Sequence, residues 1–256
     1  MFKYLMFGVN MWNRMMTALT GSENVVTPAL QIMLPVGISF YIFQNIGYVW
    51  DVYKKRAPAE KSFAKYLLFI SYFPKFTVGP IERAEGFVPQ MQQETREFSY
   101  ANAVAGLRIV MIGLFKKVAV ADVLAPVVNN VFDNPAEYTG LSLMIATILY
   151  TFQIYCDFSG YADLAIGYSK MLGINLMQNF HSPYFSKSIS GFWRRWHISL
   201  SSWFRDFVYI PLGGNRVGKM RHMFNTMVTF VLSGIWHGAS LNFWAWGGGT
   251  WDIALH

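Results

Sequence analysis

Two histidines stand in contexts that could support proton transfer. His237 lies in the run Ser-Gly-Ile-Trp-His-Gly at residues 233–238, inside an otherwise apolar segment from about Met223 to Trp246. A histidine within a membrane span must find a partner or line a wet cavity, and neutral imidazole titrates near pH 7. We therefore interpret His237 as a candidate general base. A helix-packing histidine bonded to one carbonyl is the alternative.

His197 ends the aromatic and basic run Phe-Trp-Arg-Arg-Trp-His at residues 192–197. On a continuous helix Trp193 and His197 would share a face, because they are four residues apart. Arg194 and Arg195 would then point elsewhere, toward lipid headgroups or a buried carboxylate. Taken alone, this run favours an interfacial helix with snorkelling arginines and anchoring tryptophans such as Trp196.

Two carboxylates, Asp157 and Asp163, flank a Ser-Gly pair at the predicted end of an apolar helix. We expect this helix to end in a turn and a new helix to begin, with Asp163 in its first turn. That structural interpretation is favoured over catalysis. The carboxylates could instead pair with the arginines of the segment from Ser188 to Ile210.

Other kinds of site find little support in the sequence. It has no His or Cys spacing typical of a metal site, no glycine-rich phosphate loop followed by Lys-Ser or Lys-Thr, and no Gly-x-Ser-x-Gly turn. What remains is an intramembrane histidine with a second histidine able to reach the same cavity. That pair suits proton abstraction from a hydroxyl group.

The composition indicates the elements that must position these residues. Of the 256 residues, 54% are hydrophobic and 14% are charged, against roughly 25% charged in soluble domains. Residues 24–50, 138–156 and 222–251 carry no Asp, Glu, Lys or Arg, and each is long enough for a helix to cross a bilayer. We expect a polytopic all-α membrane protein with a single domain over residues 1–256.

The predicted helices span about 28–50, 63–73, 100–124, 138–157 and 223–246, with a re-entrant or interfacial stretch at 159–172 and a helical pattern at 188–210. The net charge is +7, but the basic residues fall in short groups between apolar segments. This pattern suits cytoplasmic flanks of membrane helices better than nucleic-acid binding, and it places the loop 51–65 in the cytoplasm. Cys156 is the sole cysteine, so no intrachain disulfide is possible. We assign it to an apolar helix position.

Five blocks, read in order, resemble the membrane-bound O-acyltransferase family. They are Leu-Pro-Val-Gly-Ile-Ser-Phe-Tyr at 34–41 with Gln44, Gly-Pro-Ile-Glu-Arg at 79–83, Asp-Phe-Ser-Gly-Tyr-Ala-Asp at 157–163, the run 192–197 continuing to Gly214, and Gly-Ile-Trp-His-Gly at 234–238. The Pro-Leu-Gly-Gly-Asn-Arg sequence at 211–216 is similar to the bacterial branch that O-acetylates alginate and related surface polysaccharides. The teichoic acid D-alanylation branch is similar but less close.

The resemblance implies a ring of transmembrane and re-entrant helices around a central tunnel. His237 matches the family's catalytic histidine and would act as general base. His197 matches a second histidine that would polarise the thioester carbonyl or hold the oxyanion. Substrate binding or structural support is expected from eight residues: Trp193, Arg194, Arg195, Trp196, Asp157, Asp163, Trp236 and Asn242.

The resemblance also implies substrates and partners. An acyl thioester, acetyl-CoA or an acyl carrier, would serve as donor rather than as a bound cofactor, with no metal. The acceptor would be a polysaccharide outside a bacterial cytoplasmic (inner) membrane, which the chain would cross several times in contact with lipid. Extracytoplasmic acyl-transfer proteins are expected partners, and nucleic acid is not.

Family members are usually nearly twice this length, so the chain resembles a core truncated at both ends. The runner-up function is therefore a non-catalytic membrane component of a polysaccharide modification or export complex. A small transporter with intramembrane His and Lys as a proton relay is a third hypothesis. That hypothesis predicts inverted repeats, and the sequence shows none.

Overall fold

The computed structural model describes residues 2–20, 37–76, 78–92 and 97–238. All regular secondary structure in these ranges is helical, which confirms the expected all-α class. The chain forms two compact units. One consists of residues 40–202 and the other of residues 1–39 with 203–256.

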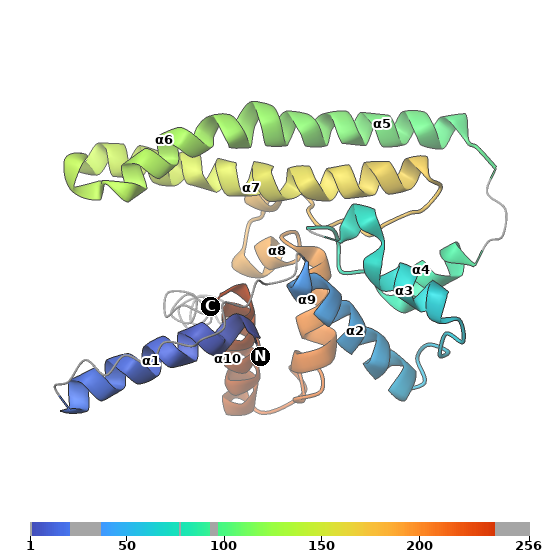
Figure 1. The fold of residues 1–256 in the computed structure, drawn as a ribbon, viewed down its shortest axis with the longest axis horizontal. Helices are drawn as coiled ribbons and strands as arrows, with labels where there is room; N and C mark the ends of the chain where they lie inside the picture. The colour runs from blue at the N-terminus through green and yellow to red at the C-terminus, as the bar shows by residue number, and fades with distance from the viewer. Residues whose placement is uncertain (1, 21–36, 77, 93–96, 239–256) are drawn as a thin grey trace. The chain divides into compact units, whose positions relative to one another are not determined.

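Two long helical rods dominate the 40–202 unit (Figure 1). The first joins α5 (Tyr100–Leu114), a π-helical stretch η2 (Phe115–Ala121) and α6 (Asp122–Asp133). After a short 3₁₀ turn, η3 (Pro135–Glu137), the chain returns antiparallel along α7 (Gly140–Met171). Within the described residues, α7 is the one helix whose length and apolar composition suffice to cross a membrane.

Glycines let these rods approach with their backbones in contact. A Cβ built on Gly167 would lie 2.7 Å from the carbonyl oxygen of Gly106, and one on Gly160 would lie 2.9 Å from that of Gly113. Gly106 and Gly113 show the reciprocal contacts, with distances of 2.6 and 2.8 Å to the carbonyls of Gly167 and Gly160. Small residues at such crossings permit close helix packing, as in membrane helices generally. We call these four residues the glycine seam.

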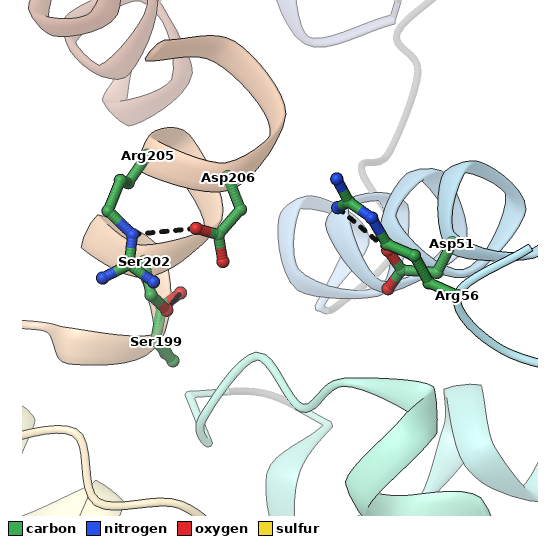
Figure 2. Close-up of polar contacts among 6 residues, drawn as sticks. All are labelled: Asp51, Arg56, Ser199, Ser202, Arg205 and Asp206. Atoms are coloured by element: carbon green, nitrogen blue, oxygen red, sulfur yellow. Dashed lines mark hydrogen bonds and ion pairs between the residues drawn. The ribbon is translucent and has the colours of Figure 1, made fainter. Parts of the chain in front are cut away.

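The rest of the unit consists of shorter helices, of which α2 starts and α9 ends two residues outside the range 40–202. They are α2 (Ile38–Tyr53), α3 (Phe63–Ser71), η1 (Phe73–Lys75), α4 (Ala84–Met91), η4 (Pro183–Phe185), α8 (Ile189–Trp193) and α9 (Ile198–Phe204). The Ser62 hydroxyl caps α3 by accepting from the Lys65 amide. Phe69 of α3 and Phe87 of α4 pack with Ala165 of α7 in one buried apolar cluster. Beyond α2, Arg56 pairs with Asp51, at 3.7 Å from Nη1 to Oδ1 (Figure 2).

The second unit contains α1 (Phe2–Thr20), the π-helical η5 (Arg205–Tyr209) and α10 (Lys219–His237). Gly213 and Gly214 turn the chain between η5 and α10 with φ of +113° and +57°, which glycine adopts without strain. The buried amide of Asn225 donates to the Gly214 carbonyl at 3.1 Å and so ties α10 to this turn.

The structure corrects three predicted boundaries. Residues 159–172 are not a separate element, because α7 continues through them to Met171. The helix predicted for 100–124 extends to Asp133 through the π-helical stretch. Residues 188–210 form no single helix, since α8 and α9 are separate. The predicted starts and ends within 21–36 and 239–256 lie outside the described residues.

Candidate active site around His197

The helical conformation of the chain is interrupted at His197, between α8 and α9. The Ser188 hydroxyl caps the five-residue helix α8 by accepting from the Gly191 amide at 3.0 Å. His197 then adopts φ of +44°, in the left-handed region, and α9 starts at the next residue. The prediction that Trp193 and His197 share a helix face is therefore wrong. Local strain of this kind persists only where surrounding contacts hold it.

A neighbouring segment holds His197 on both sides. The His181 amide donates to the Arg195 carbonyl at 2.9 Å, and the Ile198 amide donates to the Asn179 carbonyl at 2.9 Å. The side-chain oxygen of Asn179 lies 3.2 Å from Nδ1 of His197. It also lies 3.2 Å from the Ser199 amide nitrogen and 2.7 Å from the Ser199 hydroxyl. Residues 179–181 thus fix both the backbone and the imidazole ring of His197.

Aromatic rings surround the imidazole. Phe158 of α7 meets His197 edge to face with ring centroids 4.6 Å apart, and Phe180 lies 6.5 Å away in a stacked arrangement. Trp196 packs on Phe180 at 5.1 Å and stacks on Phe192 at 5.5 Å. His197 is only 3% exposed. A buried imidazole among hydrocarbon rings interacts strongly with any charge that forms beside it, because the local dielectric is low.

Tyr184 closes this aromatic cluster. Its ring lies 6.1 Å from Trp196, and its hydroxyl donates to the Thr151 carbonyl of α7 at 2.7 Å. Burial raises the pKa of Tyr184 to about 12. The phenol therefore stays neutral at physiological pH and acts here as a structural tie between η4 and α7.

The two arginines of the motif are not paired with the α7 carboxylates. Arg194 is exposed and Arg195 is half-buried. The structure gives neither guanidinium an ion pair within the described ranges. The two guanidinium groups supply positive charge next to His197 in the sequence and remain candidates for binding an anionic donor group.

Asp157 and Asp163 lie in the middle of α7, not at a helix end as predicted. The Lys117 ammonium sits 2.6 Å from Asp157 Oδ1 and 2.6 Å from Asp122 Oδ1. Lys116 pairs with Asp163 Oδ2, also at 2.6 Å. Both lysines belong to the π-helical stretch η2, and π-bulges interrupt helices frequently at functional sites. The suggestion that these carboxylates pair with arginines of 188–210 is wrong, and we assign them to structural support.

His237 is the last residue of α10 and is exposed. Its ring meets that of Trp236 edge to face at 4.7 Å. Asn242 lies outside the described residues. His237 and His197 belong to different units, so a cavity shared by the two histidines stays a prediction.

Two residues that sequence reasoning missed are central to the arrangement. Asn179 is 1% exposed and Ser199 is fully buried. The Asn-Phe pair at 179–180, ahead of the arginine motif, does not by itself indicate a functional site, because Asn is common in ordinary turns. In the part of the chain that the structure describes, no three His, Cys, Asp or Glu side chains gather as metal ligands. The chemistry that this arrangement can support is acid–base chemistry at an imidazole.

Comparison with known proteins identifies the fold family. The model of the membrane-bound O-acyltransferase family matches residues 57–253. A probable alginate O-acetylase of Azotobacter vinelandii is 42% identical over 252 residues, covering 98% of this chain and 49% of its own length. A peptidoglycan O-acetyltransferase of Helicobacter pylori is 38% identical, covering 85% of this chain and 46% of its own.

A more distant relative is a teichoic acid D-alanyltransferase of Streptococcus thermophilus, 29% identical over 83% of this chain and 54% of its own length. The chain spans about half the length of the relatives it matches. The family match covers most of the sequence, including both histidine motifs. The chain belongs to the membrane-bound O-acyltransferase family.

Proposed function

We propose that this protein is an O-acyltransferase that moves an acetyl group from a thioester onto hydroxyl groups of a polysaccharide. The relatives support the reaction class, since two of the three are named as O-acetyl-transferring enzymes and the third as a D-alanyltransferase. A long carbohydrate is the acceptor chemistry that the alginate and peptidoglycan names have in common.

The reaction needs one base and one route for a proton. The acceptor hydroxyl attacks the thioester carbonyl, an O–C bond forms, and the hydroxyl proton passes to an imidazole nitrogen. As the tetrahedral intermediate collapses, the C–S bond breaks and the thiolate takes a proton back from the imidazolium. His237 acts as the base on the acceptor. The role that His197 can take depends on which of its ring nitrogens carries hydrogen.

The observation that carries the proposal is the setting of His197. A nearly buried imidazole, held at positive φ and hydrogen-bonded through one nitrogen, is costly to build for packing alone. Strain held in place by a hydrogen-bonded neighbour is typical of functional sites. This arrangement favours a catalytic membrane protein over a non-catalytic component of a modification complex.

We further propose acetyl-CoA or an acyl carrier as the cytoplasmic donor and transfer toward the outer face of a bacterial cytoplasmic membrane, crossed several times by the chain. The bacterial relatives and the apolar helix α7 support this setting. Lipid and extracytoplasmic acyl-transfer proteins are the partners that such a route requires.

The test uses membranes from cells that express the full chain. They receive acetyl-CoA labelled in the acetyl group and de-acetylated alginate, and base-labile label on the polysaccharide is counted. We expect transfer by the wild type and loss of at least tenfold in His237→Ala, since a general base contributes roughly 10²–10⁴-fold. His222→Ala is the matched control, because His222 lies on α10 against Tyr209 and has no assigned role.

Two results would contradict the proposal. One is His237→Ala transferring acetyl at the rate of His222→Ala. The other is a folded, membrane-inserted wild type that transfers no label from either acetyl-CoA or an acetylated carrier.

A further inference from the structure

Hydrogen-bond donors around Asn179 determine how its amide is oriented. A backbone N–H can only donate, and the Ser199 amide lies 3.2 Å from the atom assigned as Oδ1. An amide turned by 180° would place its NH₂ group against that N–H, donor against donor. The side chain therefore presents its oxygen to Ser199 and to His197 together. Its Nδ2 is buried and has no hydrogen-bond partner in the described residues, so Asn179 is used here for its oxygen.

This orientation decides the tautomer of His197. An amide oxygen accepts and cannot donate, so Nδ1, 3.2 Å away, must carry the hydrogen. A neutral imidazole has one N–H, and the other nitrogen then holds a lone pair. Nε2 of neutral His197 is therefore an acceptor. The role suggested by family resemblance, in which His197 polarises a carbonyl or holds an oxyanion, would require a donor at that nitrogen.

Backbone hydrogen bonds keep His197 in this geometry. His197 is held between hydrogen bonds at Arg195 and Ile198, both to the segment 179–181. The ring itself is confined by Phe158 at 4.6 Å and Phe180 at 6.5 Å. A ring flip that exchanged the two nitrogens would turn the lone pair toward the acceptor oxygen of Asn179. Such a contact between two acceptors is unfavourable.

Charged and titratable groups lie on the segments that contact the ring, α7 through Phe158 and residues 179–181 through Asn179 and Phe180. The nearest to His197 in sequence are Arg194 and Arg195. The groups nearest to Phe158 on α7 are Tyr155, Cys156, Asp157, Tyr161 and Asp163, the segment 179–181 carries His181, and Tyr184 follows on η4. Asp157 is paired with Lys117, and Lys116 lies over the Tyr155 ring at 5.7 Å.

We propose that Asn179 is a positioning residue that holds His197 as the Nδ1–H tautomer, so that His197 enters acyl transfer as a hydrogen-bond acceptor at Nε2. This inference rests on the proposed acyltransferase function for its kinetic consequence, but not for the tautomer itself. The hydroxyl proton goes to His237 and then to the departing thiolate, so Nε2 of His197 accepts a hydrogen bond in this step and gains no proton of its own. The Nδ1–H bond to Asn179 persists throughout and keeps the lone pair on Nε2.

The tautomer can be read without any activity. The protein, labelled with ¹⁵N-histidine, is reconstituted in lipid bilayers, and its ¹⁵N spectrum is compared with that of His197→Gln. Five histidines contribute signals, and the difference spectrum isolates His197. We expect a protonated Nδ1 and an unprotonated Nε2 above pH 8. The opposite pattern, with hydrogen on Nε2, would overturn the proposal even if acetyl transfer were normal.

The pH profile of acetyl transfer then tests the role. In Asn179→Asp the carboxylate keeps the acceptor oxygen and favours imidazolium. If His197 must be neutral, the acid limb of the pH profile moves to higher pH by about one unit. The rate of acetyl transfer then falls roughly tenfold at pH values below the shifted limb and recovers at higher pH. If His197 must be a charged donor, activity instead extends further into the alkaline range, and that outcome would refute our assignment.

Controls separate this effect from misfolding and from failure of the proposed function. Asn134→Asp introduces the same charge in an exposed turn and is expected to keep the wild-type pH profile. Ser199→Ala removes one hydroxyl contact to Asn179 but keeps the backbone donor, so the ¹⁵N pattern should not change. If the wild type transfers no acetyl group, the acyltransferase assignment fails while the spectrum still decides the tautomer. If Asn179→Asp does not fold, the wild-type spectrum alone decides.

Discussion

The glycine seam between α5 and α7 predicts a specific loss of stability when a single methyl group is added. In Gly167→Ala the new Cβ would meet the Gly106 carbonyl oxygen at 2.7 Å and the Val110 amide nitrogen at 2.9 Å. Both are backbone atoms and cannot turn away, and the Cγ2 methyl group of Val110 adds a side-chain contact at 2.7 Å. To reach an ordinary contact of 3.4 Å the helices must separate by about 0.7 Å along the seam.

Two opposing terms set the magnitude. Alanine favours a helix over glycine by roughly 1 kcal/mol. Overpacking of a tight contact costs typically 1–3 kcal/mol, and separating two long helices also loosens their neighbouring contacts. We expect the clash to win, with a net destabilisation of roughly 1–2 kcal/mol. In a domain of this size that corresponds to a fall in Tm of about 2–8 °C.

The protein offers its own probe for this measurement. Cys156 is the sole cysteine and is buried on α7. A fluorogenic maleimide will therefore react with it as the helix pair opens during heating in detergent. Gly86→Ala is the matched control, because Gly86 lies on the exposed side of α4 and a Cβ there meets nothing within 4 Å. That variant should gain up to about 1 kcal/mol from helix propensity alone.

The reasoning is refuted if Gly167→Ala and Gly160→Ala unmask Cys156 at the same or higher temperature than the wild type. A gain equal to that of Gly86→Ala would mean that α5 and α7 do not touch through their backbones. We expect the unmasking temperature of Cys156 to fall in the two seam variants and not in Gly86→Ala.

The remaining predictions concern charged side chains. Lys117→Met should lower the unmasking temperature of Cys156, because Asp157 and Asp122 lose their shared cation. Adding Asp157→Asn should restore part of this loss. No recovery in the double variant would contradict the ion-pair assignment. Lys75, fully buried between the rings of Phe69 and Phe87 at 4.5 and 4.3 Å, has its pKa lowered by burial to about 7. The unfolded chain, with an ordinary lysine pKa of 10.5, binds more protons between these values, so stability should rise with pH from about 7 toward 10. Lys75→Met should flatten that rise in the same thiol assay, whereas Lys54→Met, at an exposed position, should leave it unchanged; equal slopes in both variants would show that Lys75 stays charged in the fold.

Local patterns in the sequence were sufficient for the helical class and for several element boundaries. The apolar run after Ser62 predicted a helix at 63–73, and α3 spans Phe63–Ser71. Both histidine motifs were identified from their unusual surroundings, because a polar imidazole in an apolar or aromatic run stands out in hydropathy. These are properties of neighbouring residues, which the chain carries in any conformation.

Other features depend on residues far apart in the sequence. A helix end at Asp157 was a reasonable expectation, because carboxylates and a Ser-Gly pair favour turns. The tertiary structure supplies cations 40 and 47 residues away, at Lys117 and Lys116, and so lets α7 continue through both carboxylates. Once each charge is paired across the helix contact, the energetic reason for a break disappears.

The conformation of His197 likewise depends partly on local sequence and partly on tertiary contacts. The sequence by itself determined that a histidine ends the arginine and tryptophan run, and its four-residue spacing from Trp193 predicted a continuous helix. Only the tertiary structure decided that the chain breaks there, at φ of +44°, because residues 179–181 bind both flanks of the turn. It also decided which ring nitrogen carries hydrogen, since that depends on the Asn179 oxygen, 18 residues away in the sequence and 3.2 Å away in space. Short-range patterns define the elements, whereas pairing of buried polar groups defines how the elements meet.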